Sequence, residues 1–286
     1  MSQGDGIVAR SLRRLRTRPA KAPRSHPAPD TLNPLPCARF LRALNSRSKN
    51  QSRVPVPLHI LYEDNSLIVV DKPAGLAVHR SHLVGRDDDY LVDRIREQTG
   101  RMLYLAHRLD RATSGVLVLA AGKDVAATLG AQFMQRTVAK TYLGVCRGWP
   151  APEGVVDHPL DAPGHPDPKP SITRWHTLAT GTLAVPMGRY PEQRYALLEL
   201  HPETGRHQQI RRHLHHLSHP LLGDTTHGRG DHNRLFRILL GVHRLLLHAW
   251  RVSFAHPADG RTLTVEAPPD AAWRRVFARF DWSVPG

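Results

Sequence analysis

Two kinds of hydrophobic pattern alternate along the chain. Residues 116–120 are continuously apolar, which predicts a strand buried on both faces of a sheet. Two further apolar runs, 58–63 and 67–71, flank the turn-forming pair Asp64-Asn65 and predict a hairpin. The chain therefore builds its core largely from short strands.

Longer stretches carry apolar residues three or four positions apart, which is the spacing of an amphipathic helix. Four such stretches predict helices, at residues 88–98, 124–136, 206–217 and 270–280. Further strands are predicted at 139–146, 171–178 and 195–200, and a hairpin at 243–267. Strands and helices mixed in this way predict an α+β fold.

A charged loop interrupts two of the apolar runs, 102–106 and 116–120, and places Asp110 at a strand-to-loop junction. A carboxylate close to a core requires a cation or several hydrogen-bond donors, which must come from elsewhere in the chain. A structural role is also open, because an aspartate in a turn often caps a nearby N–H, here that of Thr113 or Ser114.

The chain has 286 residues, enough for one large domain with additional segments. Its apolar runs are too short to span a bilayer, so we expect a soluble protein with no membrane partner. The two cysteines, Cys37 and Cys146, form no Cys-x-x-Cys motif and no disulfide framework. Because the sequence shows no disulfide framework, we expect a reducing compartment, the cytoplasm.

The net charge of +15 is unevenly distributed. Residues 1–53 hold ten arginines and two lysines against two aspartates, and are rich in proline. We expect residues 1–57 to form a basic, disordered arm and residues 58–286 to form the globular domain. A transit peptide, or a true start near Val54, is also compatible with this arm. The charge predicts a polyanionic partner.

Two local features predict no chemistry of their own. The proline-rich residues 161–170 are expected to be a mobile surface excursion. Four histidines, at positions 213, 215, 216 and 219, have helical spacings that can chelate zinc. No nearby carboxylate or cysteine completes the ligand set, so we expect no metal and interpret the histidines as donors facing nucleic acid.

The words HRLD (residues 107–110) and TSG (residues 113–115) together resemble the active-site motif of the RluA-type pseudouridine synthases. The stretches LYEDNSLIVVDKPAGLAVHR and TGRHQQIRRHL resemble two further blocks of that family. The resemblance covers residues 58–284. It implies the pseudouridine synthase fold, with a mixed, mainly antiparallel sheet, flanking helices and a central active-site cleft.

The resemblance also implies roles for six residues. Asp110 is the catalytic carboxylate, Arg211 its ion-pair partner, and Tyr142 lies against the target base, where its hydroxyl can take the C5 proton. Arg108, His107 and Ile210 bind the substrate: Arg108 fills the gap left by the flipped nucleotide, and Ile210 forms an apolar wall. A tyrosine in a strand is otherwise commonly a packing residue.

One departure from the family pattern concerns Gln208, which stands where the family usually has a histidine directly before the glutamine. The motif's arginine is present as Arg211, so the departure affects local hydrogen bonding and leaves the expected ion pair in place.

The implied function is conversion of uridine to pseudouridine in RNA, without a cofactor and by a monomer. The blocks GLAVHRS, GRYPEQRYALLELHPETGR, QIRRHL and HGRGDHNR resemble most the branch that modifies uridine 65 of certain tRNAs. A ribosomal RNA or dual-specificity enzyme is the alternative within the family. From other classes, an inactive RNA-binding module and a metal-dependent hydrolase are the alternatives.

Overall fold

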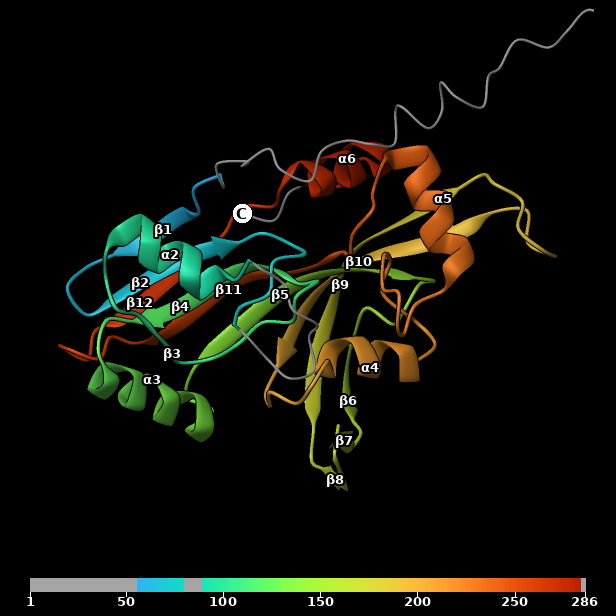
Figure 1. Ribbon diagram of the computed structural model, residues 1–286. Coiled ribbons are helices and arrows are strands. Elements are labelled where there is room, and N and C mark those ends of the chain that lie inside the picture. Colours follow the sequence, from blue (N-terminus) through green and yellow to red (C-terminus); the bar gives the residue numbers. More distant parts are fainter. Residues whose placement is uncertain (1–55, 80–88, 284–286) are drawn as a thin grey trace, which may run out of the picture. The chain divides into compact units, whose positions relative to one another are not determined.

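The computed structural model describes residues 56–79 and 89–283, and its largest element is a ten-stranded sheet (Figure 1). Eight strands follow one another in the order β1-β2-β4-β11-β5-β10-β9-β6, with β3 paired to β4 and β12 to β11. The strands are β1 (His59–Glu63), β2 (Leu67–Lys72), β3 (Tyr104–Leu105), β4 (Ser114–Ala120), β5 (Ala139–Arg147), β6 (Glu153–Asp157), β9 (Ile172–Leu183), β10 (Gln193–Pro202), β11 (Leu247–Ala255) and β12 (Thr262–Glu266).

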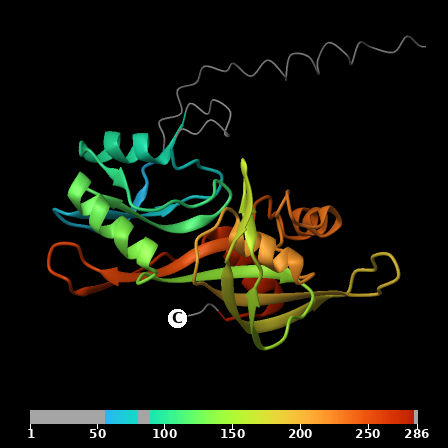
Figure 2. The ribbon, with the colours of Figure 1, turned by 90° about the horizontal axis from the view of Figure 1, so that it is seen from below.

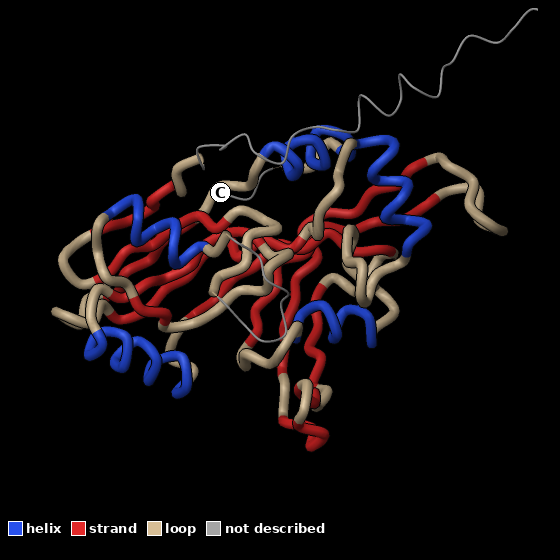
Figure 3. The backbone as a smooth tube through the Cα atoms, viewed as in Figure 1, coloured by secondary structure: helices blue, strands red, loops and turns tan. Residues whose placement is uncertain are grey.

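Five described helices lie on both sides of this sheet (Figure 3). They are α2 (Leu91–Thr99), α3 (Lys123–Gln135), α4 (Gln209–His216), α5 (Gly230–Leu240) and α6 (Ala271–Phe280). In Figure 1, α6 lies above the strands and α3 below them, whereas α2 and α4 overlap strands in this view. Among the described strands of this sheet, only β4 and β11 pair in parallel, which confirms the predicted mixed, mainly antiparallel α+β plan.

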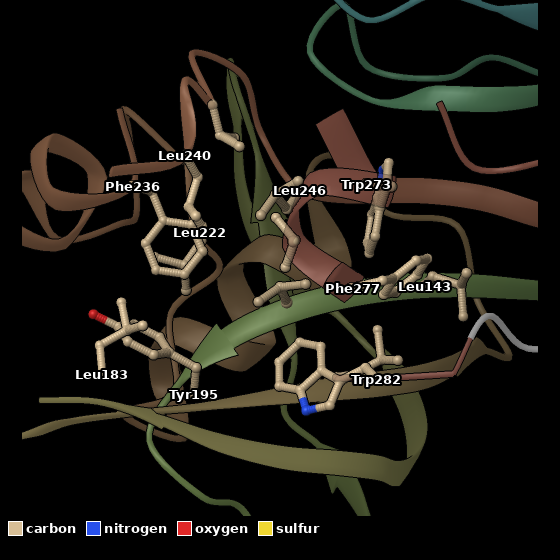
Figure 4. Packing of buried hydrophobic residues seen from close by; sticks show 14 of the residues in the cluster. Leu143, Leu183, Tyr195, Leu222, Phe236, Leu240, Leu246, Trp273, Phe277 and Trp282 are labelled. Atoms are coloured by element: carbon tan, nitrogen blue, oxygen red, sulfur yellow. The ribbon is translucent and has the colours of Figure 1, made fainter. Parts of the chain in front are cut away.

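Each helix covers the sheet with its own apolar contacts. The apolar face of α2 packs on one side of β2 and β4, and α3 packs on the other side. The helices α5 and α6 enclose the aromatic cluster shown in Figure 4, where Trp273 and Tyr195 are fully buried. Because β4 is covered on both faces, all seven of its residues are buried, as its continuous apolar sequence predicts.

The backbones of β4 and β11 approach each other closely where these two strands pair. Gly115 has φ +109°, and a Cβ atom there would lie 2.1 Å from the carbonyl oxygen of Ala249. Only glycine combines this backbone conformation with so close an approach. Gly115 thereby fixes the end of the loop that carries Asp110 against the centre of the sheet.

Most predicted elements are confirmed, including the hairpin of β1 and β2. Helix α2 ends at Gly100, which has the left-handed backbone conformation. The helix predicted from residue 206 begins only at Gln209, since Gln208 has φ 52° and stands outside it. The helix α5 was not predicted. The expected arm of residues 1–57 lies almost entirely outside the described residues.

The proline-rich segment 161–170 differs from the expectation. It forms most of a separate two-stranded hairpin, β7 (Leu160–Ala162) with β8 (His165–Lys169). Proline is compatible with a strand whose outer edge needs no partner, so its presence did not exclude a hairpin. The side chain of Arg212 in α4 also donates to the carbonyl oxygen of Asp161 at 2.7 Å, so the segment is tied to the rest of the domain.

None of the described helices combines the length and the hydrophobicity needed to cross a membrane.

Candidate active site

One large pocket of about 1000 Å³ opens beneath the sheet, between α3 and α4. Both helices lie on the near side of the sheet when it is seen from below (Figure 2). All six residues singled out from the sequence line this pocket: His107, Arg108, Asp110, Tyr142, Ile210 and Arg211. They come from the loop before β4, from β5 and from α4, so only the folded chain brings them together.

Asp110 occupies a tight turn whose hydrogen bond is made by the backbone, from the N–H of Thr113 to the carbonyl oxygen of Asp110 at 3.1 Å. The carboxylate is therefore not needed to hold the turn. Its side chain is 26% exposed, and Oδ2 accepts a hydrogen bond from Nη1 of Arg211 at 3.3 Å. The predicted ion pair is present, and the capping interpretation is not what the structure shows.

Arg211 makes its strongest contacts with a residue that the sequence analysis did not identify. Its Nε and Nη2 donate to the two carboxylate oxygens of Asp224, each at 2.8 Å. The side chains are 6% and 0% exposed, so this bidentate pair is buried. Asp224 fixes the guanidinium plane, and the remaining Nη1 points to Asp110.

The charges of this pair support one another. Burial alone would raise the pKa of Asp224, but the hydrogen bonds from Arg211 and from two backbone N–H groups lower it. Burial alone would lower the pKa of Arg211, but its bonds to Asp224 and the charge of Asp110 raise it. Both groups therefore stay ionised. The guanidinium of Arg211 binds two carboxylates, those of Asp224 and Asp110.

The loop that carries Asp110 is also held from its other side, by Lys72. This lysine is fully buried at the end of β2. Its Nζ donates to the carbonyl oxygens of Pro73, Leu76 and Arg111, at 2.9, 2.8 and 3.0 Å. Burial and, next, the charge of Arg244 lower the pKa of Lys72 to about 7. Because Arg111 directly follows Asp110, Lys72 fastens the loop to the segment after β2.

Tyr142 lies in β5 at the inner wall of the pocket, next to apolar residues of two packed clusters. Burial and then the charge of Asp110 raise the pKa of its hydroxyl well above the usual range. The hydroxyl is therefore protonated at neutral pH, and the ring offers a flat apolar surface beside Asp110.

The three residues expected to bind the substrate have different surroundings. His107 stacks on Phe133 and accepts a hydrogen bond at Nε2 from the N–H of Val118 at 3.0 Å, so its ring is built into the wall. Burial and the charge of Lys140 lower its pKa to about 3, and the ring is neutral. Arg108 is exposed, whereas Ile210 is buried in the pocket wall.

A family model described as RNA pseudouridylate synthase matches residues 66–216, more than half of the chain. The matched region includes Asp110, Tyr142 and Arg211. The chain belongs to the RNA pseudouridylate synthase family.

Individual relatives and solved structures agree with this assignment. A protein named tRNA pseudouridine synthase C from Vibrio parahaemolyticus is 40% identical over 238 residues, 80% of this chain and 97% of that protein. Its namesake from Salmonella typhi is 42% identical over 235 residues, 79% and 90% of the two chains. The structure of Human RNA Pseudouridylate Synthase Domain Containing 4 matches with a TM-score of 0.63 and 25% identity, over 80% of this chain and 95% of that one. The predicted family, fold and enzyme class are confirmed.

In this pseudouridine synthase the unusual Gln208 has a defined partner. Its Oε1 accepts a hydrogen bond from Nε2 of His227 at 2.8 Å. The adjacent Gln209 is buried and bonds to Thr204 and Thr173, at 2.6 and 3.0 Å. These bonds anchor the start of α4 to the neighbouring loop and strand, so the departure from the family pattern leaves the position of Arg211 supported.

Asp224 and Lys72 are the residues of this site that the sequence analysis missed. A signal for Asp224 was present, because a glycine followed by Asp-Thr-Thr is typical of a turn in which aspartate accepts backbone hydrogen bonds. Its carboxylate indeed accepts from the N–H groups of Thr226 and His227, each at 2.9 Å. Nothing in the local sequence connects that turn with Arg211.

Metal ligation has no visible basis in residues 56–79 and 89–283, where no group of three or more His, Cys, Asp and Glu residues is placed to hold an ion. Among the histidines of the predicted cluster, His213 bonds to Thr173 and to the carbonyl oxygen of His158, at 2.9 and 3.0 Å. His215 and His219 each bond to a backbone carbonyl.

Proposed function

We propose that this enzyme converts a uridine of tRNA to pseudouridine, at position 65, with Asp110 as its catalytic residue. The observation that carries the proposal is a single partly exposed carboxylate, held in a large pocket by an arginine whose own orientation is fixed by Asp224. The tRNA substrate is supported by relatives named tRNA pseudouridine synthase C.

The reaction breaks the bond between ribose C1′ and uracil N1 and joins C1′ to uracil C5. It resembles the first half of a glycosidase reaction, in which a second carboxylate normally activates water or the leaving group. Here the detached uracil is itself the returning nucleophile, so one carboxylate suffices. Asp110 acts either by attacking C1′ or by removing a ribose proton, and Arg211 holds it in position for both routes.

Tyr142 has a stacking role in this proposal. Its hydroxyl is protonated, so it can accept the C5 proton only by releasing its own proton at the same time. The ring can stack on the uracil without such a transfer. Stacking is thus the role that its surroundings favour, and proton relay is a second role that a substitution can separate from it.

A uridine within a stacked helix cannot reach Asp110, so it must be flipped out of the stack. Arg108 is placed to fill the resulting gap, since it lies at the pocket in an exposed position and has no hydrogen bond or ion pair to the described residues. Ile210 and His107 form the walls that hold the base. We propose that the enzyme needs no cofactor and works as a monomer in the cytoplasm.

The proposal is tested by incubating the purified full chain with unmodified tRNA and with ribosomal RNA, followed by mapping of pseudouridine at single-nucleotide resolution. We expect pseudouridine at position 65 of tRNA with the wild type and none with Asp110→Asn. Modification confined to ribosomal RNA would refute the tRNA assignment. Tight tRNA binding without any pseudouridine would support an inactive RNA-binding protein instead.

A further inference from the structure

The pocket extends well beyond the residues that the reaction uses. One face of α3 forms its outer wall with Ala127, Gly130, Ala131 and Met134, which are three or four positions apart. Met134 is 80% exposed. A Cβ atom added at Gly130 would have no other atom within 4 Å, so the small side chains leave a shallow apolar space beside the exposed methionine.

Two cations line the same end of the pocket. Arg136 ends α3, and Lys140 lies in β5. Within the described residues neither side chain forms an ion pair with a carboxylate. The only hydrogen bond of Lys140 there is a long one, 3.4 Å from Nζ to the carbonyl oxygen of Thr204. A partly buried ammonium without a counter-charge is unfavourable, and an anion at this point would relieve the cost.

Lys140 is close to the reaction site. Lys140 and Tyr142 are two residues apart in one strand, so their side chains lie on the same face, roughly 7 Å apart along the strand. A nucleotide continuing from a uridine stacked on Tyr142 would therefore bring its phosphate toward Lys140. Burial and the charge of Arg136 lower the pKa of Lys140, which is consistent with a cation that lacks a partner.

We propose that this end of the pocket is a second nucleotide subsite: Lys140 and Arg136 bind a phosphodiester next to the target uridine, and the α3 face receives the adjoining nucleoside. The subsite rests on the proposed function, because it requires an RNA substrate. The exposed, flexible thioether of Met134 and the small residues offer a surface on which the flat face of a base can stack.

The nucleoside part is tested with Gly130→Leu, which fills the space above α3. Leucine favours a helix more than glycine does, so the melting temperature should not fall. Thr128→Leu is the matched control, on an exposed position of α3 that does not line the pocket. Full-length proteins are compared by affinity and single-turnover kinetics, on tRNA and on tRNA with an abasic nucleotide at either side of the target.

We expect Gly130→Leu to weaken RNA affinity about tenfold, as loss of one base stack does, with little change in the maximal rate. With the wild type, one of the two abasic RNAs should bind about tenfold more weakly than intact tRNA. With Gly130→Leu, the same abasic RNA should bind as well as intact tRNA does. The proposal fails if each abasic RNA loses the same factor in affinity with Gly130→Leu as it does with the wild type. It also fails if Thr128→Leu weakens RNA affinity as much as Gly130→Leu does.

The phosphate part is tested with Lys140→Met, using Lys123→Met at the exposed start of α3 as control. Lys140→Met should reduce the slope of log affinity against log salt by about 0.7 to 0.9 more than the control does. A neutral methylphosphonate at one linkage beside the target should cause no further loss in this variant. The phosphate assignment would be overturned if, at both linkages, the methylphosphonate weakened binding to Lys140→Met as much as it weakens binding to the wild type. These comparisons of protein and RNA variants depend on affinity and not on catalysis. Absence of pseudouridine would therefore refute the proposed function without deciding the subsite.

Discussion

Arg211 binds Asp224 through two hydrogen bonds of 2.8 Å and Asp110 through one of 3.3 Å. The buried aspartate therefore neutralises and orients the arginine, while the partly exposed aspartate remains available to a substrate. This division explains how one cation can hold the Asp110 carboxylate without engaging both of its oxygens.

Replacing Asp110 by Asn should abolish pseudouridine formation and leave RNA binding largely intact. The amide retains the size of the side chain but can neither attack C1′ nor remove a proton. Loss of a group that acts as part of a catalytic unit typically costs on the order of 10⁴ in rate. Single-turnover assays and equilibrium binding measure the two effects, and a rate within about tenfold of wild type would exclude Asp110 as the catalytic group.

Asp224→Asn should destabilise the protein and slow the reaction together. Removing one partner of a buried ion pair typically costs roughly 3 to 5 kcal/mol, because the other charge stays buried. Urea unfolding measures this loss, and Asp231→Asn, whose carboxylate pairs with Arg229 at the surface, is the control. We expect less than about 1 kcal/mol for the control. Unchanged stability and rate in Asp224→Asn would show that Arg211 needs no fixed orientation.

Two substitutions at Tyr142 separate stacking from proton transfer. Tyr142→Phe should keep both affinity and rate if the ring only stacks, because the ring is unchanged. Tyr142→Leu should impair both. Release of tritium from C5-labelled uridine is the measurement, and a slow Phe variant with normal affinity would assign the hydroxyl a part in moving the C5 proton.

His107 should make the protein sensitive to acid. Its pKa is about 3 in the folded state, chiefly through burial, and near 6.5 in an unfolded chain. Between these values the unfolded chain binds a proton that the folded one does not, so stability falls as pH falls from about 6.5 toward 3. His107→Gln keeps an acceptor for the N–H of Val118 and removes the titration.

The free energy of unfolding should therefore decline less between pH 6.5 and 4 in His107→Gln than in the wild type. His165→Gln, at an exposed position of the β7–β8 hairpin, is the control and should decline as the wild type does. Identical slopes for all three proteins would place the proton uptake on other groups.

Deletion of residues 1–53 should spare catalysis and weaken attraction to RNA. This segment carries ten of the fifteen net positive charges and none of the pocket residues. The shortened protein should bind RNA more weakly at low salt and converge with the full chain at high salt. Affinity titrations over a salt series test this, and a change in the modified uridine would show that the segment takes part in recognition.

The sequence by itself determined most of the elements and the family. The continuous apolar run of β4 and the periodic faces of α2, α3 and α6 are local signals, so they could be predicted from neighbouring residues. The motif around Asp110 was equally local. Through the family resemblance it indicated Asp110 as the candidate catalytic residue and, with its companion blocks, Tyr142 and Arg211.

Only the tertiary structure decided how these residues are held. Asp224 lies 13 positions from Arg211 and Lys72 lies 39 positions from Arg111, and each pair meets through the fold. The start of α4 was also misplaced, because hydrogen bonds of Gln208 and Gln209 to distant residues outweigh the local helical pattern. Long-range contacts of this kind leave no periodicity in the sequence, since their energy depends on which side chains the folded sheet brings within reach.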